Sequence, residues 1–230
     1  MRANLVALIT VALSAVVSAF AWGRLPDSVP VHFGLDGQPD RFGPKAELVL
    51  GGPLLLLFFW GLFAALGAID PKVRAHEAAL EAEPDGEAAR LERKSSRSGR
   101  EAIVVAALLL VFVVHVGLLA HGAGLLAEPG RLLTLALAAF LLVAGNFMGR
   151  VRPNWFIGIR TPWTLADDGV WQRTHRLAGK LMVAAGALLV PLCLLLPGAQ
   201  VHYAAPGLFA AALLPPIVAS YLLWRRRITV

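Results

Sequence analysis

The sequence is poor in the residues on which soluble enzymes and secreted domains depend. Only 16% of its 230 residues are charged, against about 25% in soluble domains. Its single cysteine, Cys193, has no partner for an intramolecular disulfide. The chain also lacks the CxxC, HExxH, GxGxxG and P-loop patterns, which are the usual signatures of metal, dinucleotide and phosphate sites.

Hydrophobic residues are instead abundant, at 57% of the chain, and they gather in long runs. A helix that crosses a hydrocarbon layer needs about 20 apolar residues. Such a segment must be helical, because an unpaired backbone N–H or C=O in lipid has no water to bind. We therefore predict an all-α membrane protein with six transmembrane helices, at about 3–22, 48–69, 102–120, 131–149, 178–196 and 204–224.

The first run has a second interpretation. Arg2, the apolar stretch and the small residues of Ala19-Phe20-Ala21 also fit a cleavable signal peptide. The stretch is as long as a full span and longer than a usual signal core, which favours a retained helix. Mass spectrometry of the N-terminus distinguishes the two.

The basic residues predict the orientation of the spans. Of the 21 Lys and Arg residues, 17 fall at the N-terminus, in residues 70–101, in residues 150–180 and in the tail. The positive-inside rule then places both termini in the cytoplasm. The pI near 10.2 reflects this topology, and no direct nucleic-acid partner is expected.

This topology divides the chain into three parts. We predict an N-terminal two-span domain with an extracellular loop, a cytoplasmic linker, and a four-span domain with a cytoplasmic loop. In order these are 1–70 with its outer loop 23–47, 71–101, and 102–230 with its inner loop 150–177.

The predicted spans contain no Asp or Glu. Pumps and many transporters keep ionisable groups at membrane depth, which argues against a carboxylate-driven pump. The polar exceptions are His115, Asn146 and Lys180. We expect His115 to be a hydrogen-bonded interior residue, with a proton relay as the alternative.

The sequence of the linker predicts a surface helix at 72–94, interrupted at 83–86. It also predicts a basic, flexible stretch at 93–100. Basic residues beside a span bind anionic membrane lipids. A docking site for a cytoplasmic protein is the second interpretation of this stretch.

The outer loop, "LPDSVPVHFGLDGQPDRFGPK", holds four Pro and three Gly, which impose turns and forbid a long helix. His32, Asp36 and Asp40 form a weak candidate metal site, because turns could bring nitrogen and oxygen ligands together. Their spacing matches no known metal motif. In the alternative the Asp residues cap turns and His32 packs against aromatic rings. We predict no cofactor.

The inner loop, "NWFIGIRTPWTLADDGVWQRTHR", is the most elaborate stretch of the chain. Thr164 to Asp167 fits a capping box that starts a helix leading into the fifth span. Trp171 and His175 would share one face of that helix. An aromatic belt with positive-inside charge explains the residue types, whereas defined turns favour an ordered binding surface. The candidate binding residues are Arg150, Arg152, Asn154, Trp155, Arg160, Trp163, Trp171, Arg173, His175 and Arg176.

Residues 145–180, "GNFMGRVRPNWFIGIRTPWTLADDGVWQRTHRLAGK", strongly resemble the signature of the SdpI family of bacterial membrane immunity proteins. The outer loop resembles the small domain of unknown function that commonly precedes it. The resemblance implies a non-enzymatic plasma-membrane protein that protects against a secreted peptide toxin. It also implies a cytoplasmic repressor as a second partner, and it carries over no catalytic residue.

Two other function classes remain open. The first is a small-molecule or lipid transporter or channel, because both halves of the chain place a Pro/Gly-rich loop between their first two spans, as inverted repeats do. The second is a membrane-embedded lipid-modifying enzyme that uses His32, His175 or Arg160. No nucleophile–base pair supports the enzyme.

Overall fold

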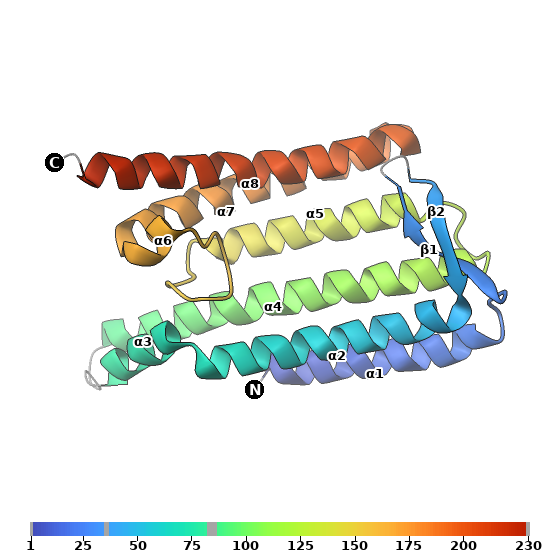
Figure 1. Cartoon of the computed structure of the whole chain (residues 1–230), viewed down its shortest axis with the longest axis horizontal. Coiled ribbons are helices and arrows are strands. Elements are labelled where there is room, and N and C mark those ends of the chain that lie inside the picture. The colour runs from blue at the N-terminus through green and yellow to red at the C-terminus, as the bar shows by residue number, and fades with distance from the viewer. Residues whose placement is uncertain (1, 35–36, 82–86, 229–230) are drawn as a thin grey trace.

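The apolar runs form long helices in the computed structural model, which describes residues 2–34, 37–81 and 87–228 (Figure 1). In chain order the elements are the helix α1 (Arg2–Trp22), the strands β1 (Ser28–Phe33) and β2 (Pro39–Pro44), and the helices α2 (Lys45–Ile69), α3 (Pro71–Glu81), α4 (Glu87–Gly122), α5 (Pro129–Met148), α6 (Pro162–Ala166), α7 (Asp168–Leu195) and α8 (Gly198–Ile228).

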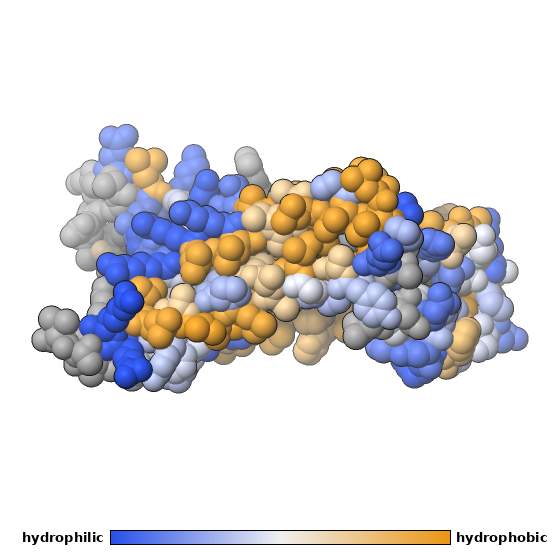
Figure 2. Space-filling model, turned by 90° about the horizontal axis from the view of Figure 1, so that it is seen from above, coloured by the Kyte–Doolittle hydropathy of each residue, from blue (hydrophilic) through white to orange (hydrophobic). Residues whose placement is uncertain are grey.

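In the part of the chain that the structure describes, six helices are long and apolar enough to cross a membrane: α1, α2, α4, α5, α7 and α8. This confirms the predicted class. On the face shown in Figure 2, hydrophobic residues form a central band and hydrophilic residues gather toward both ends. That distribution fits a bundle whose middle lies in hydrocarbon and whose ends lie in water.

The helices form two bundles that meet where α4 packs against α5. The N-terminal bundle, α1, α2 and α4, buries Leu56 and Leu108. The C-terminal bundle, α5, α7 and α8, buries Leu141 and Leu189. Because α4 contacts α1, α2 and α5, it ties the bundles together.

The helix α4 also corrects one expectation. The stretch 93–100, predicted to be flexible, is helical and runs without a break into the third span. Arg97 pairs with Glu101 four residues on, at 2.9 Å, which stabilises a helix. Ser96 and Gly99 are buried, so packing adds to this local preference. The predicted interruption at 83–86 lies outside the described residues.

Glycines bring α5 and α7 unusually close. A Cβ atom at Gly145 would lie 2.8 Å from the carbonyl oxygen of Gly179, and one at Gly179 would lie 2.6 Å from that of Gly145. Small residues let helix backbones approach where lipid supplies no hydrophobic drive for association. The C-terminal bundle therefore depends on these two positions.

The outer loop contains a β-hairpin that the sequence did not predict as strands. The strands β1 and β2 pair antiparallel, from Ser28 opposite Pro44 to Phe33 opposite Pro39. A two-stranded sheet has only edge strands, which tolerate Pro. Val29 is fully buried against the ends of the helices. We call residues 28–44 the outer hairpin.

The outer hairpin lies at one end of the bundle, and α3, α6 and the C-terminus lie at the other (Figure 1). The segment before α6 lies at this second end, which we call the loop end.

Candidate functional site

Asn154 organises the first turn of the inner loop. Its side chain is 2% exposed. Its Oδ1 accepts from the N–H groups of Phe156 at 2.8 Å and Ile157 at 2.6 Å. Its Nδ2 donates to the carbonyls of Arg152 at 3.0 Å and Ile157 at 3.1 Å. With two bonds accepted and two donated, the amide is fully satisfied, so it holds the loop and is not available to a partner.

Trp171 and His175 form the interior support of the loop. Both are fully buried, and their rings stack at 3.9 Å with an interplanar angle of 18°. Trp171 Nε1 donates to the carbonyl of Val151 at 2.8 Å. Trp171 and His175 therefore share one face of α7, as predicted, and their rings point into the protein.

The hydrogen bonds of His175 define its tautomer. Its Nε2 accepts from the N–H of Ile159 at 3.0 Å, so Nδ1 carries the proton and donates to the carbonyl of Trp171 at 2.8 Å. Gly158 has φ +112°, and a Cβ atom there would lie 2.2 Å from Nε2. The close approach of loop and ring thus requires glycine.

The predicted capping box at Thr164 is wrong, because the helix begins earlier. The N-cap of α6 is Thr161, whose side chain accepts from the N–H of Thr164, while Thr164 Oγ1 accepts from the N–H of Thr161 at 2.9 Å. Pro162 sets this start, since Pro is favoured at the first helical position. Asp167 instead caps the next helix, α7, through Val170 N–H at 2.8 Å.

Asp70, which the sequence analysis missed, ties the inner loop to the N-terminal bundle. Its carboxylate is buried and accepts backbone N–H groups of Lys72 at 2.9 Å, Val73 at 3.3 Å and Trp155 at 2.7 Å. The first two cap α3. Asp before Pro is a start signal for a helix, so the cap was predictable, whereas the bond to Trp155 was not.

Two further contacts join the inner loop and α6 to the N-terminal half of the chain. Lys72 Nζ donates to the carbonyl of Leu165, and Arg152 forms an ion pair with Glu92 of α4. The inner loop is therefore anchored to both bundles at the loop end.

The remaining candidates lie at the surface. Trp155 is 47% exposed, and Arg160 is exposed while its Nη1 donates to the Trp155 carbonyl at 2.6 Å. Trp163 is half-buried and donates to Ser220 of α8 at 2.6 Å. The other exposed members of the predicted set are Arg150, Arg173 and Arg176. Together with Arg152, whose side chain is 37% exposed, these six side chains are the ones that a partner can reach in part or in full.

The outer hairpin brings together two of its three candidate ligands. His32 Nδ1 lies 2.5 Å from Asp40 Oδ1 across the strands, and both side chains are exposed. Asp36 lies outside the described residues. Within the described part of the chain, no three potential ligands form a metal-binding group. Nearby, the hydrogen bond with Glu47 raises the pKa of the Arg41 guanidinium.

The tip of the outer hairpin meets the C-terminal bundle at His202 of α8. A Cβ atom at Gly37 would lie 2.0 Å from the His202 ring, and one at Gly130 of α5 would lie 1.6 Å from it. The ring is therefore held between two glycines from different parts of the chain. The outer hairpin therefore bridges the two bundles at one end of the molecule. The inner loop bridges them at the loop end.

An apolar groove of about 390 Å³ opens beside the outer hairpin, between α1 and the end of α4. Its lining includes Val17, Phe20, Leu119 and Leu125, with Arg24 as its one charged residue. We call it the outer groove. Deeper in this bundle, His115 is buried and lies 2.9 Å from Ser18 Oγ, in the hydrogen-bonded interior position expected for it.

Comparisons with known proteins agree with the predicted resemblance. The SdpI/YfhL protein family matches residues 150–220, and the domain of unknown function DUF1648 matches residues 9–57. Immunity protein SdpI of Bacillus subtilis (strain 168) is 24% identical over 195 residues, which cover 84% of this chain and 82% of that protein. An uncharacterized protein of Archaeoglobus fulgidus is 44% identical over 43 residues, 19% of this chain and 24% of that protein. No solved structure shows a significant match.

These matches confirm the resemblance to the SdpI family and to the domain that precedes it. Together with the six apolar helices, they indicate a multi-pass membrane protein.

Proposed function

We propose that this chain, which carries an SdpI/YfhL domain over residues 150–220, is an immunity protein of the bacterial plasma membrane. It would protect its host from a secreted antimicrobial peptide. The observation that carries this proposal is the similarity to an immunity protein along most of both chains. The wide match matters because its 195 residues extend well beyond residues 150–220, which the family model matches. An immunity function requires no chemistry of the chain, so we propose a non-enzymatic protein.

The distribution of basic residues supports an orientation with both termini in the cytoplasm. The outer hairpin and the outer groove then face the side from which a secreted peptide arrives. The groove is lined almost entirely by apolar side chains, and Leu125 at its rim is 77% exposed. An apolar peptide would gain by burying its own side chains there. We therefore assign peptide binding to the outer groove.

Protection is tested by expressing the chain in a Bacillus subtilis strain that lacks its own Immunity protein SdpI. The probe is the peptide toxin that this immunity protein counters, and the readout is survival normalised to the level of the chain in the membrane. We expect the chain to restore survival. A strain that makes the chain at a normal level and dies like the empty-vector strain would contradict the proposal for this toxin.

The assignment to the outer groove has a matched pair of variants on α1. Val17→Trp places an indole in the groove, while Val16→Trp places the same group on the exposed neighbouring face. We expect Val17→Trp to lose protection and Val16→Trp to retain it at equal membrane level. Equal protection by both variants would remove the groove from the mechanism and leave the immunity function intact.

We further propose that the exposed part of the inner loop signals to a cytoplasmic repressor. Trp155 and Arg160 are joined by a hydrogen bond and lie at the surface. An exposed guanidinium and an exposed indole on one short loop suit a protein partner, because Arg and Trp are enriched at binding hot spots. The loop also contacts both bundles, so a peptide that shifts one bundle against the other would displace it.

Signalling is tested with a reporter fused to the promoter of the chain's own gene. We expect Arg160→Gln to abolish the toxin-dependent rise of the reporter, with Lys180→Gln, at an exposed position of α7 outside the candidate set, as the control of equal charge change. Arg160→Lys extends the test, because Lys keeps the charge but cannot bind an acidic group in a bidentate way. A full response in Arg160→Gln cells at normal protein level would show that this surface does not signal.

A further inference from the structure

A cavity of about 510 Å³ lies between the two bundles toward the loop end. Its walls come from α2, α4, α5, α7 and α8, and the inner loop closes one side. Phe63, Val104, Met182 and Phe209 represent the apolar lining. The volume lies in the range of small-ligand pockets, about 300–1,000 Å³. Apart from Arg160 and Thr161 of the inner loop its lining is apolar, so its natural contents are apolar.

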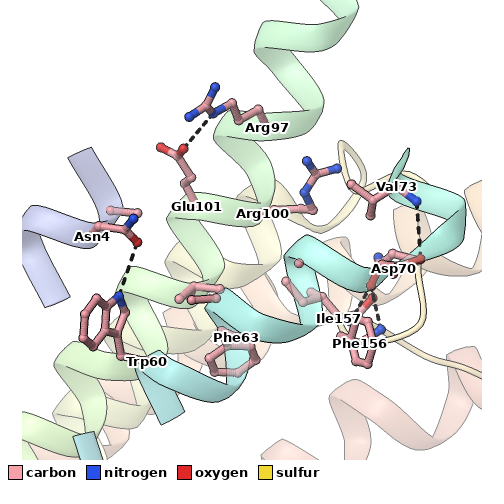
Figure 3. Close-up of a pocket in the computed structure, with 15 residues that line it drawn as sticks. Asn4, Trp60, Phe63, Asp70, Val73, Arg97, Arg100, Glu101, Phe156 and Ile157 are labelled. Atoms are coloured by element: carbon pink, nitrogen blue, oxygen red, sulfur yellow. Dashed lines mark hydrogen bonds and ion pairs between the residues drawn. The ribbon is translucent and has the colours of Figure 1, made fainter. Parts of the chain in front are cut away.

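A smaller cavity of about 190 Å³ adjoins the first and is polar on one side (Figure 3). The two share four lining residues, Phe63, Val104, Phe156 and Ile157. In Figure 3, Arg97 and Arg100 of α4 border the cavity opposite Trp60 and Phe63 of α2. The two adjoining cavities, which we together call the joined cavity, are therefore amphipathic, with an apolar compartment between the bundles and a charged compartment beside it.

The smaller cavity is lined by two carboxylates, Asp70 and Glu101, and two guanidinium groups, Arg97 and Arg100, so hydrogen-bonding capacity and not net charge decides which ion it favours. Asp70 is already bound by three backbone N–H groups, so its carboxylate has little capacity left for a cation. Arg97 donates through Nε to Glu101 at 2.9 Å, and Arg100 donates to Ser96 at 3.4 Å. A guanidinium has five N–H donors, so each Arg can also bind a phosphate oxygen.

We propose that the joined cavity binds one anionic phospholipid from the leaflet at the loop end. Its phosphate would lie at Arg97 and Arg100, and an acyl chain would fill the cavity between the bundles. Basic pockets between transmembrane helices bind anionic headgroups in this way. The site is distinct from the outer groove and does not depend on the immunity function.

The position of this site means that a bound lipid would affect the arrangement of the inner loop. The acyl chain would contact both bundles, and the headgroup would lie next to Asp70 and Asn154, which hold the inner loop. The lipid would therefore stabilise the loop in the arrangement described here, in addition to the protein's own contacts.

The test is native mass spectrometry of the purified full chain, with phosphatidylglycerol and phosphatidylcholine supplied as an equimolar mixture. We expect one retained phosphatidylglycerol per chain. Arg100→Gln should reduce the retained fraction about tenfold, as expected for a lost charge-assisted contact, while Lys94→Gln on the exposed side of α4 should leave it unchanged.

A second pair of variants tests the apolar compartment without changing charge. Val104→Trp fills the junction of the two cavities and should abolish retention, whereas Leu109→Trp, on a lipid-facing position of α4, should not. Thermal unfolding of each variant in detergent confirms that it is folded.

Three results would overturn the proposal. They are equal retention of the two lipids by the unaltered chain, unchanged retention by both Arg100→Gln and Val104→Trp, or displacement of the lipid by millimolar glycerol phosphate. The last would show that the headgroup alone binds and that the apolar cavity contributes nothing.

Discussion

Single residues of the inner loop act mainly from inside the protein. The His175 ring supports the loop backbone through Ile159, and the Asp70 carboxylate does so through Trp155. A buried polar group that loses its partner costs more free energy than the bond contributed. The loop is therefore sensitive to changes at positions that no partner can reach.

Gly158→Ala should lower the free energy of unfolding. A strained backbone conformation alone costs about 1–3 kcal/mol, and we expect a larger loss here. The added Cβ would also lie 2.2 Å from His175 Nε2. Gly124→Ala is the control, because Gly124 has φ +73° but no atom within 4 Å of its Cβ position. Denaturation in detergent measures both. Equal losses in the two variants would show that the His175 contact adds nothing.

Asp70→Asn should cost about 1–3 kcal/mol, because the amide places N–H groups against backbone donors. It should also loosen the inner loop, since the bond from Trp155 crosses between the bundles. Proteolysis within residues 150–161 reports that loosening. Asp168→Asn, at an exposed position, should resist cleavage like the unaltered chain. Equal resistance of both variants would contradict the role given to Asp70.

At the scale of elements, short segments hold the long helices in place. The five-residue helix α6 is too short to be stable alone. It depends on the reciprocal bonds of Thr161 and Thr164 and on Trp163, which packs against Tyr221 of α8. The outer hairpin is equally small, and its buried Val29 and its contact with His202 hold it.

Thr161→Ala should destabilise α6 by about 1 kcal/mol, the usual cost of an N-cap. Thr161→Ser keeps the hydroxyl and should cost much less. Hydrogen exchange of the amides of residues 162–166 measures the change. If the Ala and Ser variants exchange at the same rate, the cap does not stabilise the helix.

At the scale of the whole molecule, two bundles meet through α4 and α5 and are bridged again at both ends. The outer hairpin makes one bridge and the inner loop the other. Such an arrangement can transmit a shift of one bundle from end to end, because both bridges contact both bundles. Binding at the outer groove and signalling at the loop end would then be coupled.

The orientation of the whole molecule is tested by cysteine labelling from outside the cell. In a Cys193→Ser background, a cysteine at Gln38 should react with a membrane-impermeant maleimide, and one at Asp168 should not. The reason is the concentration of Lys and Arg at the loop end. Lysed cells, in which both sites react, provide the control. The reverse pattern in intact cells would exchange the roles of the two surfaces.

The sequence by itself determined the class and the spans of this protein. Hydropathy over about 20 residues is a local property, and lipid leaves a long apolar segment no alternative to a helix. The shared face of Trp171 and His175 was predictable for the same reason, since residues four apart on one helix are neighbours. The predicted helix start at Thr164 was wrong, although helix capping is a local feature of the sequence. The reason is that Pro162 is a stronger start signal.

Only the tertiary structure decided which distant residues meet. Asp70 is 85 positions from Trp155, and His202 is far in sequence from both Gly37 and Gly130. No periodicity encodes such contacts, because they depend on how the bundles pack and where the loops cross. The same holds for the cavity between the bundles, whose walls come from five helices. Its apolar lining was visible in the sequence as ordinary spans. Its volume, and the position of Arg97 and Arg100 in the adjoining smaller cavity, were decided only by folding.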